Sequence, residues 1–483
     1  MRLLILTTLL AISFSGYGNW FDKAKEQYNN LETQVKQKIS GNKKKEPLVL
    51  PKNIPTDWHV KVIKEPVFNS KMLLVESGLK NSQTIILVHG LGQNGHIDWI
   101  ETIELLKHKY HVLSFDFPGF GYSEKPKGQF SPKNYAKLVQ WLIKNFAHQF
   151  KVTVVGHSMG GAVAIRLTAD YPEVVDKLLL IDVAGILQRT AYIKHVSSIP
   201  VSANAPGIVK KTLNTIDDLS DSFVELANSK LDISKDGHIW TALSNSTPNV
   251  NAAMQFIEEN FSSALRKISH DVHIVWGVKD PVTPLRTGKM IAYLLKGAQL
   301  SLIEGAGHVP MKTHFTAYSK WLIQSLNKQS VGANYQPKNS KLKNRLECKN
   351  KTGIVYSGSY KTVVIDHCAA VTLKNLYTNQ LIIRDSVVQT ENIIVKSNST
   401  ALRAVDSVIL DTNSLFEGRI AVQLHGSRLD FAGTTLSGTT NAMRITLKSR
   451  LVLSVCEIKS PSYNGFSHAT YTIKKGNLDD YLF

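Results

Sequence analysis

One segment constrains the fold of this chain more than any other: a β-branched run, a glycine-flanked serine and an apolar run of helical type. Residues 151–155 read Lys-Val-Thr-Val-Val, which is typical of a buried strand. Residues 156–160 follow as Gly-His-Ser-Met-Gly, and 162–165 as Ala-Val-Ala-Ile. In this context G-x-S-x-G places the serine on a sharp turn with its hydroxyl exposed. The residues two before and two after must be small, because larger side chains would collide with strand and helix. We therefore predict a nucleophile at Ser158.

Other short apolar runs also end in loops that carry candidate chemistry. They are 84–88 before His89-Gly90-Leu91-Gly92, 112–116 before 117–123, 177–181 before Asp182, 274–277 before Asp280, and 302–303 before His308. Because the carboxyl ends of parallel strands meet at one edge of a sheet, these loops should converge on Ser158.

The series resembles the α/β-hydrolase family, including its Ser, Asp, His chain order, over residues 58–328. The resemblance implies the α/β class, with a doubly wound, mostly parallel sheet. Between Ala184 and His273 lies a segment longer than a bare strand connection needs. At this position the family carries a helical cap, and we expect one over 187–270.

The resemblance also implies a role for each site residue. Ser158 is similar to the nucleophile, and His308 to the general base that takes its proton. Asp280 resembles the carboxylate that orients the histidine, while the backbone N–H groups of Met159 and Leu91 would form the oxyanion hole. The triad chemistry needs neither cofactor nor metal, and we expect none.

Several neighbouring residues have competing interpretations. Asp182 is an alternative to Asp280, because some relatives carry the acid after that earlier strand. Gly277-x-x-Asp280-Pro favours Asp280, since it stands where the family's usual acid stands. For His89 and His157 a structural role is favoured over a catalytic one. Asp116 precedes a turn and is interpreted as a residue that caps its loop.

The amino-terminal residues predict export. Met1-Arg2 is followed by an apolar run over 3–14 and then by small residues, as in a signal peptide spanning 1–18. We expect a periplasmic, cell-surface or secreted protein with no transmembrane helix. Residues 19–57 predict an amphipathic helix and linker. Its apolar stripe either docks on the protein's own surface, the favoured interpretation, or contacts anionic lipid.

The last third of the chain repeats. After a polar linker at 329–342, similar short segments recur in which the serines stand 20 to 22 positions apart: Ser386, Ser407, Ser427 and Ser449. A period near 20 without intervening helices is typical of a solenoid. This pattern resembles a right-handed parallel β-helix and predicts a second, all-β domain over 343–483.

The function of the solenoid is open from sequence alone. Arg403 and Arg444 stand in step with Gln423 between them, which could contact an anionic glycan, but a structural or adhesive role is favoured. Cys348 and Cys368 could form a disulfide before the first coils, and whether they do is left open. A net charge of +19 without zinc-finger spacing or an aromatic–basic RNA signature gives no support for a nucleic-acid partner.

The leading interpretation is an exported serine hydrolase that cleaves a small or lipid-like carboxylic ester. C–C bond, amide or thioester hydrolysis on the same triad is the alternative. A different class is a non-enzymatic surface-binding or adhesion protein in which the solenoid is the working part. All triad residues precede residue 329, so the solenoid should be separable from catalysis. The opposing view is that it packs against the cap and shapes the pocket.

Overall fold

The computed structural model describes residues 54–92, 94–126, 128–188, 248–295, 297–332, 337–339 and 341–482. The expected signal peptide, nearly all of the 19–57 segment and cap residues 189–247 lie outside these ranges. In the described ranges, no helix combines the length and apolar character that a membrane span requires.

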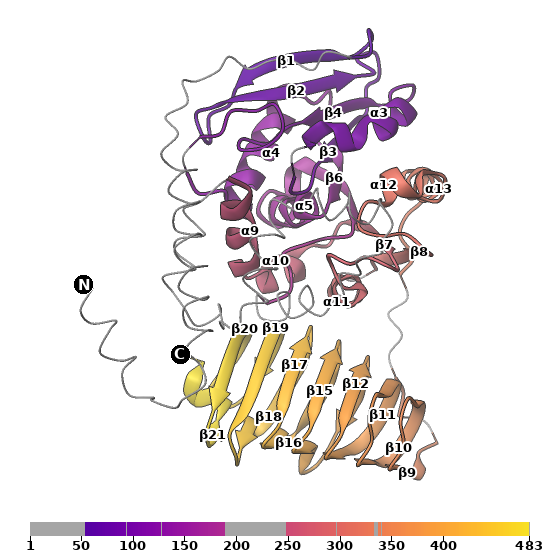
Figure 1. The fold of residues 1–483 in the computed structure, drawn as a ribbon, viewed down its shortest axis with the longest axis vertical. Coiled ribbons are helices and arrows are strands. Elements are labelled where there is room, and N and C mark those ends of the chain that lie inside the picture. Colours follow the sequence, from indigo (N-terminus) through magenta and orange to yellow (C-terminus); the bar gives the residue numbers. More distant parts are fainter. Residues whose placement is uncertain are drawn as a thin grey trace, which may run out of the picture. The chain divides into compact units, whose positions relative to one another are not determined.

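The first part is built on a sheet of eight strands in the order β1-β2-β4-β3-β5-β6-β7-β8 (Figure 1). β1 pairs with β2, and β2 with β4, in antiparallel fashion, whereas every pairing from β4 to β8 is parallel. The strands are β1 His59–Lys64, β2 Lys71–Ser77, β3 Thr84–Val88, β4 His111–Phe115, β5 Val152–His157, β6 Val175–Ile181, β7 Asp271–Gly277 and β8 Gln299–Ile303.

Alternate residues along these strands enter two different cores. Ile86 and Val88 pack into one core with residues of α4, α5 and α11, while Ile85 and Leu87 pack into the other with α3 and α13. Burial of both faces explains why the parallel strands read as continuous apolar runs. The helices are α3 Ile100–Leu106, α4 Pro132–Phe146, α5 Met159–Asp170, α9 Pro248–Glu258, α10 Ser262–Lys267, α11 Leu285–Leu294, α12 Pro310–Thr313 and α13 Phe315–Asn327, with 3₁₀ turns η1 Gly95–Trp99 and η2 Pro172–Val174.

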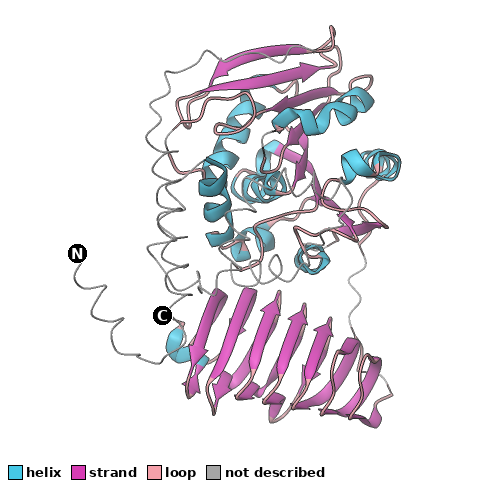
Figure 2. Cartoon of the chain, viewed as in Figure 1, coloured by secondary structure: helices cyan, strands magenta, loops and turns pink. Residues whose placement is uncertain are grey.

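The carboxy-terminal part is a stack of parallel β-coils and contains almost only strands (Figure 2). Equivalent residues lie beside one another in successive coils: Val388 pairs with Ile409, Ile409 with Leu429, and Leu429 with Leu451. The predicted parallel β-helix architecture is confirmed. Its strands are β9 Lys343–Lys349, β10 Val355–Asp366, β11 Val371–Arg384, β12 Val387–Glu391, β13 Ile394–Lys396, β14 Thr400–Val405, β15 Val408–Thr412, β16 Leu415–His425, β17 Arg428–Ala432, β18 Thr435–Ile445, β19 Ser449–Lys459, β20 Asn464–Ile473 and β21 Gly476–Asn477.

The repeated serines form a ladder at one buried turn of the coils. The Ser386 N–H donates to Ser407 Oγ, Ser407 N–H to Ser427 Oγ, and Ser427 N–H to Ser449 Oγ, over 3.1 to 3.2 Å. Each hydroxyl in turn donates to the carbonyl two residues earlier in its own coil. The serines recur because every turn contains a buried backbone N–H that needs an acceptor.

The two ends of the β-helix are closed differently. Cys348 and Cys368 form a disulfide near the first coils, while Cys456 is a buried free thiol. At the other end, β20 pairs antiparallel to β19, and the 3₁₀ turn η4, Leu478–Tyr481, follows β21. This antiparallel strand ends the parallel stacking of the coils.

The stretch predicted as a linker runs from the end of α13 to the start of β9. Its first residues are bonded to the part built on the eight-stranded sheet, since the Ser330 N–H donates to Asp271 and the Gly332 N–H to the Gly297 carbonyl. The domain boundaries derived from the sequence stay predictions.

Candidate active site

Ser158 lies in a strained turn between β5 and α5. Its φ of 53° and ψ of −120° belong to a region of backbone conformation that residues other than glycine rarely adopt. The end of β6 and the residues after it hold the turn, because the Ser158 N–H donates to the Ile181 carbonyl and the Ala184 N–H donates to the Ser158 carbonyl. The strain therefore persists because both backbone polar groups of Ser158 are fixed by this neighbouring segment.

The glycines around Ser158 are required by close backbone packing. A Cβ placed on Gly156 would lie 2.6 Å from the Gly160 carbonyl oxygen, and one on Gly160 would lie 2.1 Å from the Val88 carbonyl oxygen. Neither contact involves a side chain that could move away. The spacing G-x-S-x-G thus follows from the crossing of β5, α5 and the end of β3.

The structure brings Ser158, His308 and Asp280 together from the ends of β5, β8 and β7. The Ser158 hydroxyl lies 2.9 Å from Nε2 of His308, and Nδ1 of His308 lies 2.8 Å from Oδ2 of Asp280. With Nδ1 protonated, the ring donates to Asp280 and accepts from the Ser158 hydroxyl. All three residues are buried, so the relay is screened from bulk water.

Asp280 is held as a carboxylate by groups of its own loop. Oδ1 accepts from the N–H groups of Val282 and Thr283, and Oδ2 accepts from the Thr283 hydroxyl as well as from His308. Burial alone would raise the pKa of Asp280, but His308 and these hydrogen bonds outweigh it and lower that pKa. Thr283 was not singled out from the sequence; its position three residues after the acid, where an Asx-type turn can form, was the available signal.

Asp182, the competing acid, lies elsewhere in the network. Its Oδ1 accepts from the Gly277 N–H at 2.8 Å, and no hydrogen bond joins it to His308 within the described residues. Burial and the neighbouring charge of Asp280 raise the pKa of Asp182 well above its ordinary value. Asp182 is therefore a weaker acid than Asp280, the carboxyl group that faces His308.

The loop after β3 runs directly against the serine. A Cβ on Gly90 would lie 2.9 Å from Cβ of Ser158, so only glycine fits this approach. His89 fixes the loop, because its Nε2 accepts from the Phe117 N–H and its Nδ1 donates to the Gly90 carbonyl. Met159 is the first residue of α5, and such an N–H has no intrahelical acceptor. Leu91 follows Gly90 in the same loop, which places both predicted oxyanion donors on segments beside Ser158.

From the sequence, His157 was interpreted as structural and Asp116 as a residue that caps its loop. His157 Nε2 lies 2.7 Å from the carbonyl oxygen of His308, so it contacts the main chain of His308 and not its ring nitrogens. Asp116 accepts from the backbone N–H groups of His96 and Tyr122 and from the His96 ring, which is the predicted loop-capping role.

The described carboxy-terminal part of the cap region is helical. It contains α9 and α10, and Phe256 of α9 packs on Gly185 and against Tyr135 of α4. Residues 189–247, on which the remaining cap prediction depends, lie outside the described residues.

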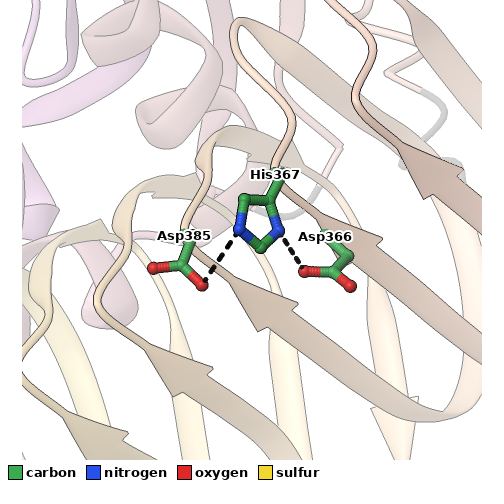
Figure 3. A group of neighbouring side chains, drawn as sticks. All are labelled: Asp366, His367 and Asp385. Carbon is green, nitrogen blue, oxygen red and sulfur yellow. Dashed lines mark hydrogen bonds and ion pairs between the residues drawn. The ribbon is translucent and has the colours of Figure 1, made fainter.

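One group of side chains could bind a metal ion. Donor atoms of Asp366, His367 and Asp385 lie within 4.8 Å of one another on the β-helix surface (Figure 3). However, the two ring nitrogens face different carboxylates: Nδ1 lies 2.8 Å from Asp366 and Nε2 lies 3.8 Å from Asp385. An ion shared by all three groups would have to break the His367–Asp366 contact.

The predicted Arg403–Gln423–Arg444 alignment is present in the β-helix. Arg403 pairs in register with Gln423, and Gln423 with Arg444. Both arginines are exposed.

Comparison with known proteins agrees with this geometry. Residues 83–199 match the family model described as alpha/beta hydrolase fold. The chain is 28% identical over 249 residues to the uncharacterized protein Rv2715 of Mycobacterium tuberculosis, covering 47% of this chain and 70% of the relative. It is 27% identical to Lipase 1 of Psychrobacter immobilis, covering 50% and 76%. It is 24% identical to 2-hydroxy-6-oxo-6-(2'-aminophenyl)hexa-2,4-dienoic acid hydrolase of Metapseudomonas resinovorans, covering 51% and 85%.

The sheet order, the strained serine turn and the family match together define the class. The first part of the chain has the α/β-hydrolase fold, and a β-helix-like domain follows it.

Proposed function

We propose that the protein is an exported serine hydrolase that cleaves a carboxylic ester through an acyl-enzyme. The observation that carries this proposal is the Ser158–His308–Asp280 relay, with hydrogen bonds of 2.9 and 2.8 Å. The substrate is a small or lipid-like ester. The similarity to Lipase 1 of Psychrobacter immobilis supports this class of substrate.

In the first half-reaction, Ser158 Oγ attacks the ester carbonyl carbon while His308 Nε2 accepts the hydroxyl proton. Asp280 stabilises the imidazolium that forms. Its four accepted hydrogen bonds keep it ionised and fixed in place. The negatively charged oxygen of the tetrahedral intermediate accepts hydrogen bonds from the backbone N–H groups of Met159 and Leu91. Collapse breaks the C–O bond, and His308 delivers its proton to the leaving alcohol.

In the second half-reaction, water takes the place of the alcohol. His308 removes a proton from that water, which attacks the acyl carbon, and the proton then returns to Ser158 as the acid leaves. No oxidant, metal or cofactor takes part in these steps, since each one moves only protons and an acyl group.

The alternative is C–C bond hydrolysis on the same triad, and similarity to the aminophenyl hexadienoic acid hydrolase supports it. A serine-directed fluorophosphonate tests both chemistries, because labelling requires the activated serine but no particular substrate. We expect the wild-type chain to be labelled and Ser158→Ala not to be. Turnover of p-nitrophenyl esters of graded acyl length, compared with turnover of a vinylogous diketone, then distinguishes ester hydrolysis from C–C bond hydrolysis. Turnover of the diketone alone would contradict the ester proposal.

Export is a separate part of the proposal. The signal-like pattern of residues 1–18 supports it, and the three cysteines suit an oxidising compartment because two of them form a disulfide. Amino-terminal sequencing of the protein made in cells should find the first 15–18 residues removed, as such signals are. An intact Met1 on a cytoplasmic species would contradict export.

A further inference from the structure

The β-helix binds one helix of the hydrolytic part through a partly buried arginine. Arg286, the second residue of α11, donates from Nε to the Thr412 hydroxyl and from Nη1 to the Asp430 carboxylate, at 2.9 and 3.0 Å. Its Nη2 donates to the carbonyl oxygens of Asp411 and Asp430, at 2.6 and 2.9 Å. The guanidinium therefore binds the ends of two neighbouring coils, β15 and β17.

This contact is well suited to fix the arginine. The Arg286 side chain is only 12% exposed and that of Asp430 15% exposed, so water screens their attraction weakly. A planar guanidinium that binds several acceptors at once also fixes direction, which a lysine cannot do in the same way. The contact thus sets the orientation of α11 as well as its distance from the coils.

A second point of attachment lies one turn further along α11. Lys289 forms an ion pair with Glu391 of β12, and Asn413 donates from Nδ2 to the Lys289 carbonyl. A Cβ on Gly433 would lie 2.8 Å from Cγ of Met290, so the helix surface is in close contact with the coil. Two attachment points prevent α11 from pivoting about one of them.

The start of α11 is continuous with the loop that holds the triad acid. Asp280 receives hydrogen bonds from Val282 and Thr283, and α11 begins at Leu285, directly after Pro284. The loop is also tied to the sheet, because Trp276 donates from Nε1 to the Thr283 carbonyl. Only Pro284 and Leu285 separate Thr283 from Arg286, so displacement of α11 would reach the Asp280 loop directly.

The β-helix also binds both described ends of the cap region. At the start of the insertion, the Gln188 N–H donates to the Ser454 hydroxyl at 3.0 Å. At its end, Arg266 of α10 donates to the Val455 carbonyl, and its guanidinium lies 4.3 Å from the ring centroid of Phe466. The coils thus contact the insertion on either side of residues 189–247.

We propose that Arg286 is a positioning residue for the hydrolytic reaction: by binding β15 and β17 it fixes α11, and through α11 it holds Asp280 against His308. The β-helix is then a structural part of the active site and not a separable appendage. The sequence predicted a solenoid that is separable from catalysis, whereas these contacts favour the opposing view, in which the solenoid shapes the site. This inference rests on the proposed serine hydrolase function.

The test uses the full chain with Arg286→Ala, Arg286→Lys and Asp430→Asn. The last variant keeps Arg286 and removes only the charge of its partner. The matched control is Arg345→Ala, which removes an exposed arginine that pairs with Glu347 within the same β-helix. Two readouts are taken: the second-order rate constant of fluorophosphonate labelling per folded molecule against pH, and amide hydrogen exchange over residues 278–294.

We expect Arg286→Ala to slow labelling about 3- to 30-fold, as coupling between separate sites commonly does. The pH midpoint of labelling should move to lower pH, because a displaced Asp280 stabilises the imidazolium of His308 less. Exchange in 278–294 should rise. Arg286→Lys and Asp430→Asn should give smaller changes in the same direction, and Arg345→Ala none.

Two results would overturn the proposal. One is a wild-type rate, midpoint and exchange pattern in both Arg286→Ala and Asp430→Asn. The other is a lower labelled fraction with an unchanged rate constant and midpoint, since that indicates a merely structural role. If the wild-type chain is not labelled at all, the serine hydrolase function fails, whereas hydrogen exchange in 278–294 still decides whether Arg286 holds the loop.

Discussion

His157 donates a hydrogen bond from Nε2 to the main-chain carbonyl of His308, with 2.7 Å between nitrogen and oxygen. The residue that precedes Ser158 thus holds the backbone of His308, the proposed general base. Among the described residues no donor or acceptor pairs with Nδ1 of His157, which is buried. Burial, and then the nearby His308, lower the pKa of His157 to about 3. His157 is therefore neutral and acts as a fixed donor at any pH near neutrality.

The first prediction follows from that lowered pKa. In the unfolded chain His157 gains a proton near its ordinary value of 6.5, whereas in the folded chain it does so only near 3. Between these values the unfolded state binds more protons, so the stability contributed above 6.5 is lost as the pH falls toward 3. His157→Gln keeps a donor and does not titrate. Its free energy of unfolding should fall less steeply between pH 6.5 and pH 4 than that of the wild type.

Chemical denaturation at several pH values measures this slope. His59→Gln is the matched control, since His59 is exposed on β1 and its replacement should leave the slope unchanged. Parallel slopes for the wild type and His157→Gln would show that burial of His157 does not govern acid sensitivity.

The second prediction concerns the strained backbone at Ser158. Both Ser158→Ala and Ser158→Gly should lower hydrolysis by roughly 10⁴-fold or more, because the nucleophile is lost. Their stabilities should differ, however. Glycine adopts a φ of 53° and a ψ of −120° without strain, so Ser158→Gly should be about 1–2 kcal/mol more stable than Ser158→Ala. Paired denaturation curves measure the difference, and equal stabilities would show that this backbone carries no strain.

The strands and the serine turn were predictable because local patterns determine them. The run at 84–88 is β3, and that at 177–181 forms most of β6. The serine frame of the β-helix was also predictable, since each coil repeats the same buried turn with the same need for an acceptor. At these positions the local backbone conformation restricts which residue types can occur nearby, so the sequence pattern indicates the structure.

Contacts between segments that are far apart in the sequence produce no local sequence pattern from which they could be predicted. Arg286 and Asp430 are 144 residues apart, and nothing near either residue in the sequence indicates the other. The sequence favoured Asp280 over Asp182 through the family resemblance, but the contact of Asp280 with His308 across the strand ends is seen only in the structure. The Cys348–Cys368 pairing could be suggested from sequence, but it needed the register of β9 against β10 to bring Cys348 of β9 next to Cys368, which follows β10.

The third prediction addresses the serine ladder. Ser407→Ala removes the acceptor of the buried Ser386 N–H and leaves that N–H without its partner. The cost should be about 1–3 kcal/mol, the usual penalty for an unpaired buried polar group. Ser399→Ala is the control, because Ser399 is exposed at a neighbouring turn. A thermal transition that shifts equally in both variants would mean that the ladder contributes nothing specific.

The fourth prediction separates the two acids by activity and by pH. Asp280→Asn should lower kcat by about 10⁴-fold, because an amide cannot stabilise the imidazolium of His308. Asp182→Asn should stay within about threefold of the wild type, since an amide is close in shape to a carboxyl group and still accepts from the Gly277 N–H. Steady-state kinetics on one short-chain ester measures both effects, and the reverse order would assign the catalytic role to Asp182.

The stability of the two variants should depend on pH in opposite senses. The pKa of Asp182 is raised in the folded chain, so above 3.8 the unfolded state loses a proton that the folded state keeps, and stability falls as the pH rises. Asp182→Asn removes this loss and should gain stability relative to the wild type from pH 4 to pH 7. The pKa of Asp280 is lowered, so its contribution is present above 3.8 and lost as the pH falls. Asp280→Asn should therefore be least stable, relative to the wild type, at neutral pH, and should approach it in acid. If the two differences change in the same direction with pH, the charge states assigned to this carboxyl pair are wrong.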